Sequence, residues 1–191
     1  MTTLEFPFGT LAFRERGTGP PLLLVMGTGA DHTSWARQIP ALARDFRVIA
    51  PDNRGSGRSV PAPSLGATTA SFAAEALALL DALGVGSFHV AGYSFGAAIA
   101  MELMMLAPER TLAASLHAGW AGPNPATTSA LTLSLEVAHR GPEAFLEAAC
   151  RRNMSPAFRE NSAFPRFLQN VLESATLPTL VQATSAATLA G

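Results

Sequence analysis

Ser94 is the residue whose surroundings best suit chemistry, because it lies between two glycines in the segment Gly92-Tyr93-Ser94-Phe95-Gly96. The apolar run at 88–91 is typical of a buried strand, and the alanine-rich run at 97–100 begins a helical pattern. Small residues on both sides allow the backbone to turn sharply, so the hydroxyl at the tip faces outward. A G-x-S-x-G segment also occurs in ordinary turns, but its position between a strand and a helix favours a nucleophile.

The same turn would direct the start of the following helix at Ser94. Free N–H groups and the positive end of the helix dipole would then face negative charge that develops near Ser94 Oγ. An attacked carbonyl becomes an oxyanion, so the arrangement suits acyl transfer. On these residues the segment resembles the nucleophile elbow of the α/β-hydrolase superfamily.

A second glycine segment, Gly27-Thr28-Gly29, follows an apolar strand expected at 22–26. Members of the superfamily commonly carry His-Gly here, whereas this sequence has Met26 before Gly27. The resemblance implies that the backbone N–H groups of Thr28 and Phe95 form an oxyanion hole, which needs no particular side chain at Thr28. A plain glycine turn after a strand is the alternative interpretation. The elbow and loop glycines assigned in this way are Gly27, Gly29, Gly92 and Gly96.

A third segment, at 52–59, contains an aspartate, two arginines and two glycines. It could suggest a phosphate site, but it lacks the third glycine of a dinucleotide fingerprint and the Lys-Ser/Thr ending of a P-loop. It resembles the D-x-R-G-x-G-x-S loop of α/β hydrolases. We expect a structural role, in which Asp52 and Arg54 hold the loop through charge-assisted hydrogen bonds.

The elements that must position these segments alternate between strands and helices, which predicts an α/β fold with a mostly parallel sheet and helices on both faces. A hairpin joined at Gly9-Thr10 begins the chain. Right-handed crossovers would bring the strand ends at Gly27, Asp52, Ser94 and Gly119 to one edge of the sheet. The predicted strands are 3–8, 11–16, 22–26, 46–50, 88–91 and 111–118, the last of them buried. Three helices are predicted. The first carries Trp35, Ile39 and Leu42 and is interrupted at Pro40, and the second spans 68–83. The third runs from Ala97 to Pro108, with Met101, Met104 and Met105 expected to fill the core.

The sequence changes character after Gly122, where helical patterns follow and no strand is predicted. The resemblance implies a helical cap that covers the substrate pocket. We therefore divide the chain into an α/β-hydrolase core at 1–122 and a cap segment at 123–191. The apolar positions of the cap pattern are Leu131, Leu135, Ala138, Phe145, Leu146, Ala149, Phe167, Val171 and Leu172.

The partners that a serine nucleophile needs are missing from the expected places. A base and an orienting carboxylate are required, and in this superfamily both follow the serine on loops after the final strands. Beyond Ser94 the sequence has no aspartate, and its only histidines are His117, expected to be buried, and His139, expected to be solvated. We expect that the final strands are absent from this chain and that the base and the acid lie beyond Gly191.

Composition sets limits on the other classes of function. The 191 residues are 48% hydrophobic, which is enough for one core, and a net charge of -1 with 14% charged residues gives no sign of nucleic-acid or membrane binding. A lone Cys150 excludes an internal disulfide framework. With no signal peptide and no membrane span, we expect a soluble cytoplasmic protein, and neither a metal nor a cofactor is predicted.

The resemblance implies a hydrolase that attacks carboxylic esters or lactones with Ser94 and forms an acyl-enzyme. Serine at this position argues against haloalkane dehalogenases and epoxide hydrolases, which use aspartate. Thioesterase, carbon–carbon hydrolase, aminopeptidase and haloperoxidase chemistry stay open. The alternatives are a catalytically incomplete fragment and a binding protein of the same fold. In a fragment, the strand at 111–118 becomes an exposed apolar edge that invites self-association.

Overall fold

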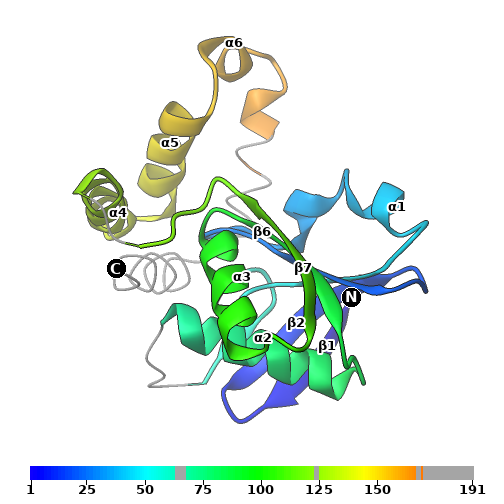
Figure 1. Cartoon of the computed structure of the whole chain (residues 1–191). Helices are drawn as coiled ribbons and strands as arrows, with labels where there is room; N and C mark the ends of the chain where they lie inside the picture. Colours follow the sequence, from blue (N-terminus) through cyan, green and yellow to red (C-terminus); the bar gives the residue numbers. More distant parts are fainter. Residues whose placement is uncertain (63–67, 123–124, 167–168, 170–191) are drawn as a thin grey trace.

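The computed structural model describes residues 1–62, 68–122, 125–166 and 169 (Figure 1). Its centre is a seven-stranded sheet in the order β1-β2-β4-β3-β6-β7, with β5 paired to β2. The strands β4, β3, β6 and β7 are parallel, and β1 and β2 add antiparallel to them. The predicted α/β architecture is confirmed. The strands are β1 (Thr2–Phe6), β2 (Gly9–Arg16), β3 (Pro21–Val25), β4 (Arg47–Pro51), β5 (Val60–Pro61), β6 (Phe88–Tyr93) and β7 (Thr111–His117).

The N-terminal hairpin forms as predicted, but its turn lies earlier than expected. Phe6 pairs with Gly9, so Pro7 and Phe8 make the turn and Gly9 already belongs to β2. Gly9 has a φ of 122°, and a Cβ added there would lie 2.2 Å from the carbonyl oxygen of Val60. The glycine therefore serves the close approach of β5, which the sequence pattern did not reveal.

One face of the sheet is covered by α2 (Thr69–Ala82) and α3 (Phe95–Leu106). Thr68 and Ser71 form a capping box that starts α2, which satisfies N–H groups that have no intrahelical partner. The helix predicted at 68–83 turns an apolar stripe to the core, where Phe72, Ala76 and Leu80 are buried against the sheet and α3. Burial of such a stripe is the main source of stability for a helix of this length.

The opposite face carries η1 (His32–Trp35) and α1 (Ile39–Leu42). Pro40 lies in the first turn of α1, where its missing N–H costs nothing. The predicted helix is therefore interrupted at this proline, and Trp35, Ile39 and Leu42 still pack into one cluster against the sheet. Helices on both faces confirm the prediction.

Within the described part of the chain, β7 is the final strand and lies at the edge of the sheet, and it is not the buried strand that its apolar sequence indicated. Most of its residues are exposed, including Leu112 and Leu116. Met104 and Met105 of α3 are exposed too, so the prediction that they fill the core is wrong. An apolar pattern indicates that a strand or helix can be buried, but burial also requires a neighbouring element that packs on it.

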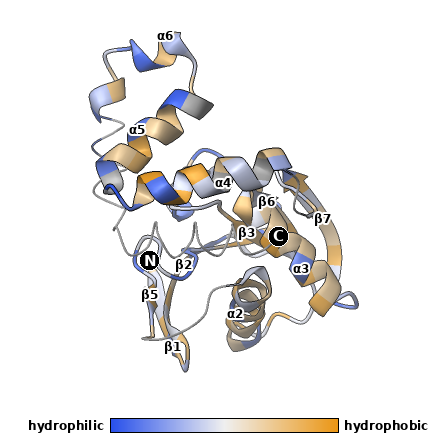
Figure 2. Ribbon diagram, turned by 90° about the vertical axis from the view of Figure 1, so that its left-hand side faces the viewer, coloured by the Kyte–Doolittle hydropathy of each residue, from blue (hydrophilic) through white to orange (hydrophobic). Residues whose placement is uncertain are grey.

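Beyond β7 the chain forms α4 (Pro125–Ala138), α5 (Pro142–Asn153) and α6 (Pro156–Arg159). Both views show α5 and α6 extending away from the sheet (Figures 1 and 2). The helical pattern is confirmed up to Arg159, whereas the predicted positions Phe167, Val171 and Leu172 lie outside the described residues. None of the helices in the described part has the length and apolar character needed to cross a bilayer.

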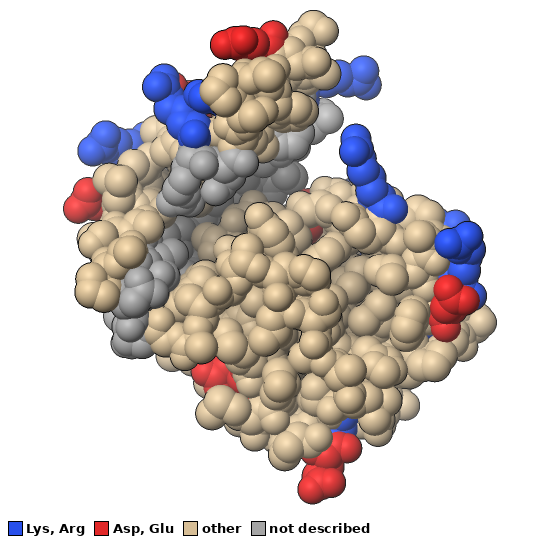
Figure 3. All heavy atoms as spheres, turned by 45° about the horizontal axis from the view of Figure 1, so that its top comes forward, with Lys and Arg blue, Asp and Glu red and all other residues tan. Residues whose placement is uncertain are grey.

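Charged side chains are sparse on the surface seen in Figure 3, and they stand mostly at its periphery. This distribution agrees with a sequence in which 14% of residues are charged. The face seen in this view therefore offers no broad basic surface of the kind that binds a phosphate backbone.

Candidate active site

Ser94 occupies the single position between β6 and α3, at the tip of the turn. Its φ of 56° and ψ of -120° are unusual for a residue with a side chain, and such a conformation costs about 1–3 kcal/mol. Two backbone hydrogen bonds hold it: Ser94 N–H donates to the carbonyl of His117 over 2.8 Å, and Ala97 N–H donates to the carbonyl of Ser94 over 2.9 Å. Ser94 is partly exposed, so its hydroxyl is not packed in the interior.

Gly92 and Gly96 are required by the close approach of three backbones around this turn. A Cβ added at Gly92 would lie 2.2 Å from the carbonyl oxygen of Gly96, and one added at Gly96 would lie 2.2 Å from the carbonyl oxygen of Val25. Real Cβ atoms do not come this close to backbone oxygens. Only glycine at both positions lets β3, β6 and the start of α3 meet at Ser94.

The loop after β3 lies directly against Ser94. A Cβ added at Gly27 would lie 3.0 Å from Ser94 Cβ and 3.5 Å from Ser94 Oγ. The carbonyl of Gly27 accepts a hydrogen bond from Ala30 N–H over 3.3 Å, and Gly29 has a φ of 71°, which together define a tight turn. Because the C=O and N–H of a trans peptide point in opposite directions, Thr28 N–H is directed out of this turn.

Phe95 supplies the first N–H of α3. At this helix position the N–H has no intrahelical acceptor and is free for another partner. The Phe95 ring is buried, and its edge packs against Phe72 of α2 with 5.2 Å between ring centres. The helix start is thus fixed by the core, as an oxyanion donor requires.

Asn53 holds the Thr28 loop, and sequence reasoning missed it. Its side-chain Nδ2 donates to the carbonyl of Met26 over 2.7 Å, immediately before Gly27. Asn53 sits at a variable position of the D-x-R-G segment, so the sequence pattern carried no signal for this contact.

The predicted structural role of the 52–59 loop is confirmed for Asp52. Its carboxylate is 1% exposed and accepts hydrogen bonds from His32 N–H over 2.9 Å and from Arg58 N–H over 3.0 Å. His32 Nδ1 lies 2.7 Å from the same carboxylate. Asp31, His32 and Asp52 are residue types that bind metals and their ligand atoms lie within 4.8 Å of one another. Here one Asp52 oxygen joins the two loops through His32, and the other accepts the Arg58 N–H within its own loop.

Arg54 also holds the loop, through a buried ion pair with Glu75. The sequence predicted the role of Arg54 but not its partner. Its Nε lies 3.2 Å from the Glu75 carboxylate of α2, and its guanidinium stands 4.8 Å from the centre of the Phe72 ring. Burial raises the pKa of Glu75 to about 7, although Arg54 lowers it in part. Helical periodicity alone does not distinguish a buried glutamate from an exposed one.

All four histidines of the sequence belong to the described residues, and the side chain of each contacts a group other than the Ser94 hydroxyl. No side chain among the described residues is hydrogen-bonded to Ser94 Oγ. His117 is exposed, not buried as predicted, because it lies on the edge strand. The contacts are His32 Nδ1 to Asp52 at 2.7 Å, the His89 ring to Phe46 at 5.7 Å, His117 Nε2 to Ser115 Oγ at 2.8 Å and His139 Nδ1 to the Leu135 carbonyl at 2.8 Å.

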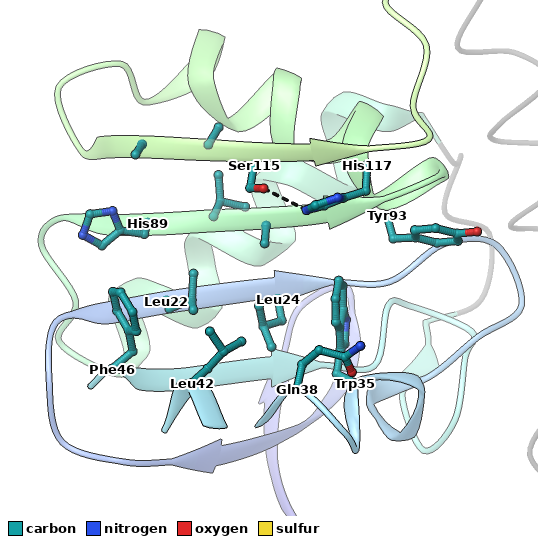
Figure 4. Close-up of a pocket in the computed structure, with 14 residues that line it drawn as sticks. Leu22, Leu24, Trp35, Gln38, Leu42, Phe46, His89, Tyr93, Ser115 and His117 are labelled. Carbon is teal, nitrogen blue, oxygen red and sulfur yellow. Dashed lines mark hydrogen bonds between the residues drawn. The ribbon is translucent and has the colours of Figure 1, made fainter. Parts of the chain in front are cut away.

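A largely apolar groove of about 590 Å³ runs along the face of β3, β6 and β7 that η1 and α1 cover only in part (Figure 4). Trp35 and Phe46 line one side, and Ser115 and His117 line the other. Its lining includes Tyr93 but neither Ser94 nor Thr28. The groove therefore lies beside the candidate site and is not lined by its central residue, Ser94.

Comparison with known proteins gives one family. Residues 20–176 match the alpha/beta hydrolase fold. The putative carbamate hydrolase RutD of Stutzerimonas stutzeri is 32% identical over 136 residues, which are 71% of this chain and 51% of that protein. The putative non-heme bromoperoxidase BpoC of Mycobacterium tuberculosis is 41% identical over 110 residues, 56% of this chain and 41% of that protein.

Solved structures show the same fold. A thermophilic esterase from Thermogutta terrifontis superposes with a TM-score of 0.82 and 28% identity, covering 100% of this chain and 72% of the esterase. The chain spans about half the length of the curated relatives that it matches, as the 51% coverage of RutD indicates.

Proposed function

The chain belongs to the α/β-hydrolase family, and on this basis we propose that it carries the nucleophile of a hydrolase acting on carboxylic esters or lactones. The observation that carries the proposal is the strained backbone of Ser94, held between β6 and α3 with the Gly27 loop against its hydroxyl. The strain persists because three backbones fix it, and such strain gathers at functional sites.

In the proposed reaction Ser94 Oγ attacks the carbonyl carbon of the substrate and loses its proton to a base. The N–H groups of Thr28 and Phe95 stabilise the oxyanion that forms. Collapse of the tetrahedral intermediate breaks the bond to the alcohol oxygen, which takes the proton from the base. Water then attacks the acyl-enzyme in the same way, and this second step releases the acid and restores Ser94.

The base and its carboxylate partner are, in this proposal, supplied from outside the 191 residues. Among the described residues no imidazole of the four histidines is hydrogen-bonded to Ser94 Oγ, and His32, which has a carboxylate partner, uses it to join two loops. A serine hydroxyl without a base is a weak nucleophile at neutral pH. The 191-residue chain alone is therefore expected to be almost inactive.

The segment at 123–191 is proposed to cover the substrate, with residues 1–122 as the catalytic core. Its described helices α4, α5 and α6 follow the strand whose C-terminal end contacts Ser94, because the carbonyl of His117 accepts the Ser94 N–H. A chain that continues from this point is well placed to close over the turn.

A second candidate function is a fragment or binding protein without turnover, which the missing base favours. Assay of p-nitrophenyl acetate hydrolysis by the chain and by Ser94→Ala tests whether the chain alone turns over substrate through Ser94. We expect equal rates for the two, because an oxyanion hole and binding alone leave only about 10³–10⁴-fold over water. Serine-dependent turnover by the chain alone would overturn the placement of the base.

The nucleophile itself is tested by supplying the missing groups. The C-terminal segment of the Thermogutta esterase, fused after Gly191 or added as a separate chain, is expected to restore hydrolysis that Ser94→Ala abolishes. Restored hydrolysis that survives Ser94→Ala would contradict the assignment of Ser94. The control is Ser115→Ala, which removes a hydroxyl that lies on the edge strand and bonds only to His117.

A further inference from the structure

A pocket of about 260 Å³ lies between β2 and the segment that holds η1 and α1, and two arginines, Arg14 and Arg16, line it. We propose that this pocket binds a small soluble phosphate monoester, with both guanidinium groups on the phosphate and the organic part on Ile39 and Pro40. Ser94 is not among the lining residues. The inference therefore concerns a second site and does not depend on the chemistry of the first.

The strand geometry places both arginines on one face of the sheet. Phe13 belongs to the cluster that α2 and α3 cover, and side chains alternate along a strand, so Arg14 and Arg16 project on the opposite face. Their partners on β4, Ala50 and Val48, belong to the cluster on that same face. Residues two apart on a strand lie about 6.6 Å from each other, so the two long side chains can hold one anion between them.

The positive charge of the two arginines is not neutralised within the described part of the chain. Glu15 projects on the other face, where its carboxylate lies 2.5 Å from Arg47 Nε. Neither Arg14 nor Arg16 forms an ion pair or a side-chain hydrogen bond with any described residue. Two like charges on one face of a strand repel each other, and an anion between them removes this repulsion.

The aspartates nearest to the pocket are held by other groups. His32 lines the pocket, but its Nδ1 lies 2.7 Å from the carboxylate of Asp52, which is 1% exposed. Asp31 accepts a hydrogen bond from Thr33 N–H over 2.9 Å. All lining residues lie within the described range 14–40, and no carboxylate is among them. The lining therefore favours an anion.

Two guanidinium groups favour a phosphate monoester over a carboxylate. A guanidinium binds either group through two parallel hydrogen bonds. A phosphate monoester carries a charge of about -1.5 to -2 at pH 7, which matches two arginines, whereas a carboxylate carries one negative charge. Between the arginines and the helix the lining is apolar, with Ala36, Ile39 and Pro40, so an organic group attached to the phosphate has a surface to pack on. Pockets for drug-sized ligands begin at about 300 Å³, so this ligand is small.

Charged residues also protect the edges of sheets, and this is the competing explanation for the arginines. The pairing of β1 with β2 ends at Thr2 and Phe13, so β2 has no β1 partner at residues 14–16. Protection of an edge requires charge alone, whereas the proposed site requires a saturable pocket with a defined ligand. Binding measurements separate the two explanations.

Ligand-observed NMR titration of the 191-residue chain with phenyl phosphate tests the proposal, at low ionic strength because salt screens exposed charges. Two charge-assisted contacts at an open site give a weak complex, so we expect a dissociation constant on the order of 1 mM. Inorganic phosphate lacks the apolar part and benzoate lacks the second charge, so each should bind at least about tenfold more weakly. No saturable binding of phenyl phosphate would overturn the proposal, and equal affinity for benzoate would overturn the choice of a dianion.

Arginine substitutions test the contacts. Arg14→Gln and Arg16→Gln should each weaken phenyl phosphate binding at least about tenfold, the usual effect of losing a charge-assisted hydrogen bond. Both side chains are exposed and without a described partner, so circular dichroism should show a normal fold. Arg44→Gln is the matched control, because it removes the same charge from an arginine that does not line the pocket. Equal weakening by all three variants would mean general charge attraction and would contradict the site.

A carboxylate placed in the pocket provides a second test. Ala36 is exposed and lines the pocket, so Ala36→Glu should pair with the arginines and abolish phenyl phosphate binding without loss of the fold. Ala41→Glu adds the same charge at an exposed position outside the lining and should leave binding unchanged. Sedimentation with phosphatidic-acid vesicles separates a lipid headgroup from a soluble ligand. A folded Ala36→Glu chain that binds like the parent, or binding to the vesicles but not to phenyl phosphate, would overturn the proposal whatever the outcome for hydrolysis.

Discussion

At the scale of single residues, the site depends on two positions that carry no side chain. Two missing Cβ atoms, at Gly92 and Gly96, allow β3, β6 and α3 to meet, and the meeting forces Ser94 into a φ of 56°. The strain at the serine is thus maintained by packing at the glycines two residues away on either side. This is why the glycines of the turn matter as much as the serine that they flank.

Gly96→Ala is expected to destabilise the fold strongly. The new Cβ would lie 2.2 Å from the carbonyl oxygen of Val25, which belongs to a central strand and cannot move away cheaply. Overpacking of this kind costs about 1–3 kcal/mol or more, and urea unfolding measures it. The matched control is Gly86→Ala, where an added Cβ meets no atom within 4 Å. Equal stability of the two variants would show that β3 does not press on the start of α3.

Glu75→Gln is expected to change how stability depends on pH. Folding raises the pKa of Glu75 from 4.5 to about 7, so the folded protein keeps a proton that the unfolded chain releases in this interval. This group therefore stabilises the fold fully below pH 4.5, and its contribution falls as the pH rises to about 7. The full difference corresponds to about 3 kcal/mol.

Urea unfolding between pH 4 and pH 8 measures the effect, and the neutral glutamine should remove this part of the slope. Glu109→Gln provides the control, because Glu109 is exposed. A Glu75→Gln variant with the slope of the parent chain would mean that the carboxyl is hydrated in solution. The ion pair with Arg54 would then also be weaker than its burial indicates.

At the scale of elements, the sequence predicted the strands and helices well where local signals determine them. The apolar stripe at Phe72, Ala76 and Leu80 identifies α2, and Pro40 identifies the break between η1 and α1. The hairpin turn was predicted at the wrong residues because the φ of Gly9 is required by β5, and this two-residue strand has no recognisable sequence pattern.

Burial was predicted less well, because it depends on neighbours that are distant in sequence. The apolar pattern of β7 suits a covered strand, yet no described element covers its free edge. The same reason explains Met104 and Met105, which lie on the outer side of α3. The positions of Ser94, Gly27 and Asp52 at one sheet edge were predictable, since the crossover rule fixes them. The side-chain contacts of Asn53 and Glu75 were not, because they join segments that pattern analysis treats separately.

At the scale of the whole molecule, the described chain has two unequal parts. Residues of β3, β6, α2 and α3 share one continuous core. In contrast, α4 packs mainly on α5, and none of the described residues of α4, α5 and α6 belongs to the main clusters. Stability is therefore expected to be distributed unevenly between the sheet core and these helices.

Hydrogen exchange should reveal this difference through α2 and α4, which are both 14 residues long. Amides in α2 open only when the core unfolds, because Phe72, Leu79 and Leu80 are buried beneath it. Those of α4 open with a smaller free energy, since few contacts outside α5 must break. We expect α4 to exchange at least tenfold faster, which corresponds to a difference of about 1.4 kcal/mol in opening free energy. Equal protection of the two helices would mean that the cap segment is anchored to the core as firmly as the helices beneath the sheet.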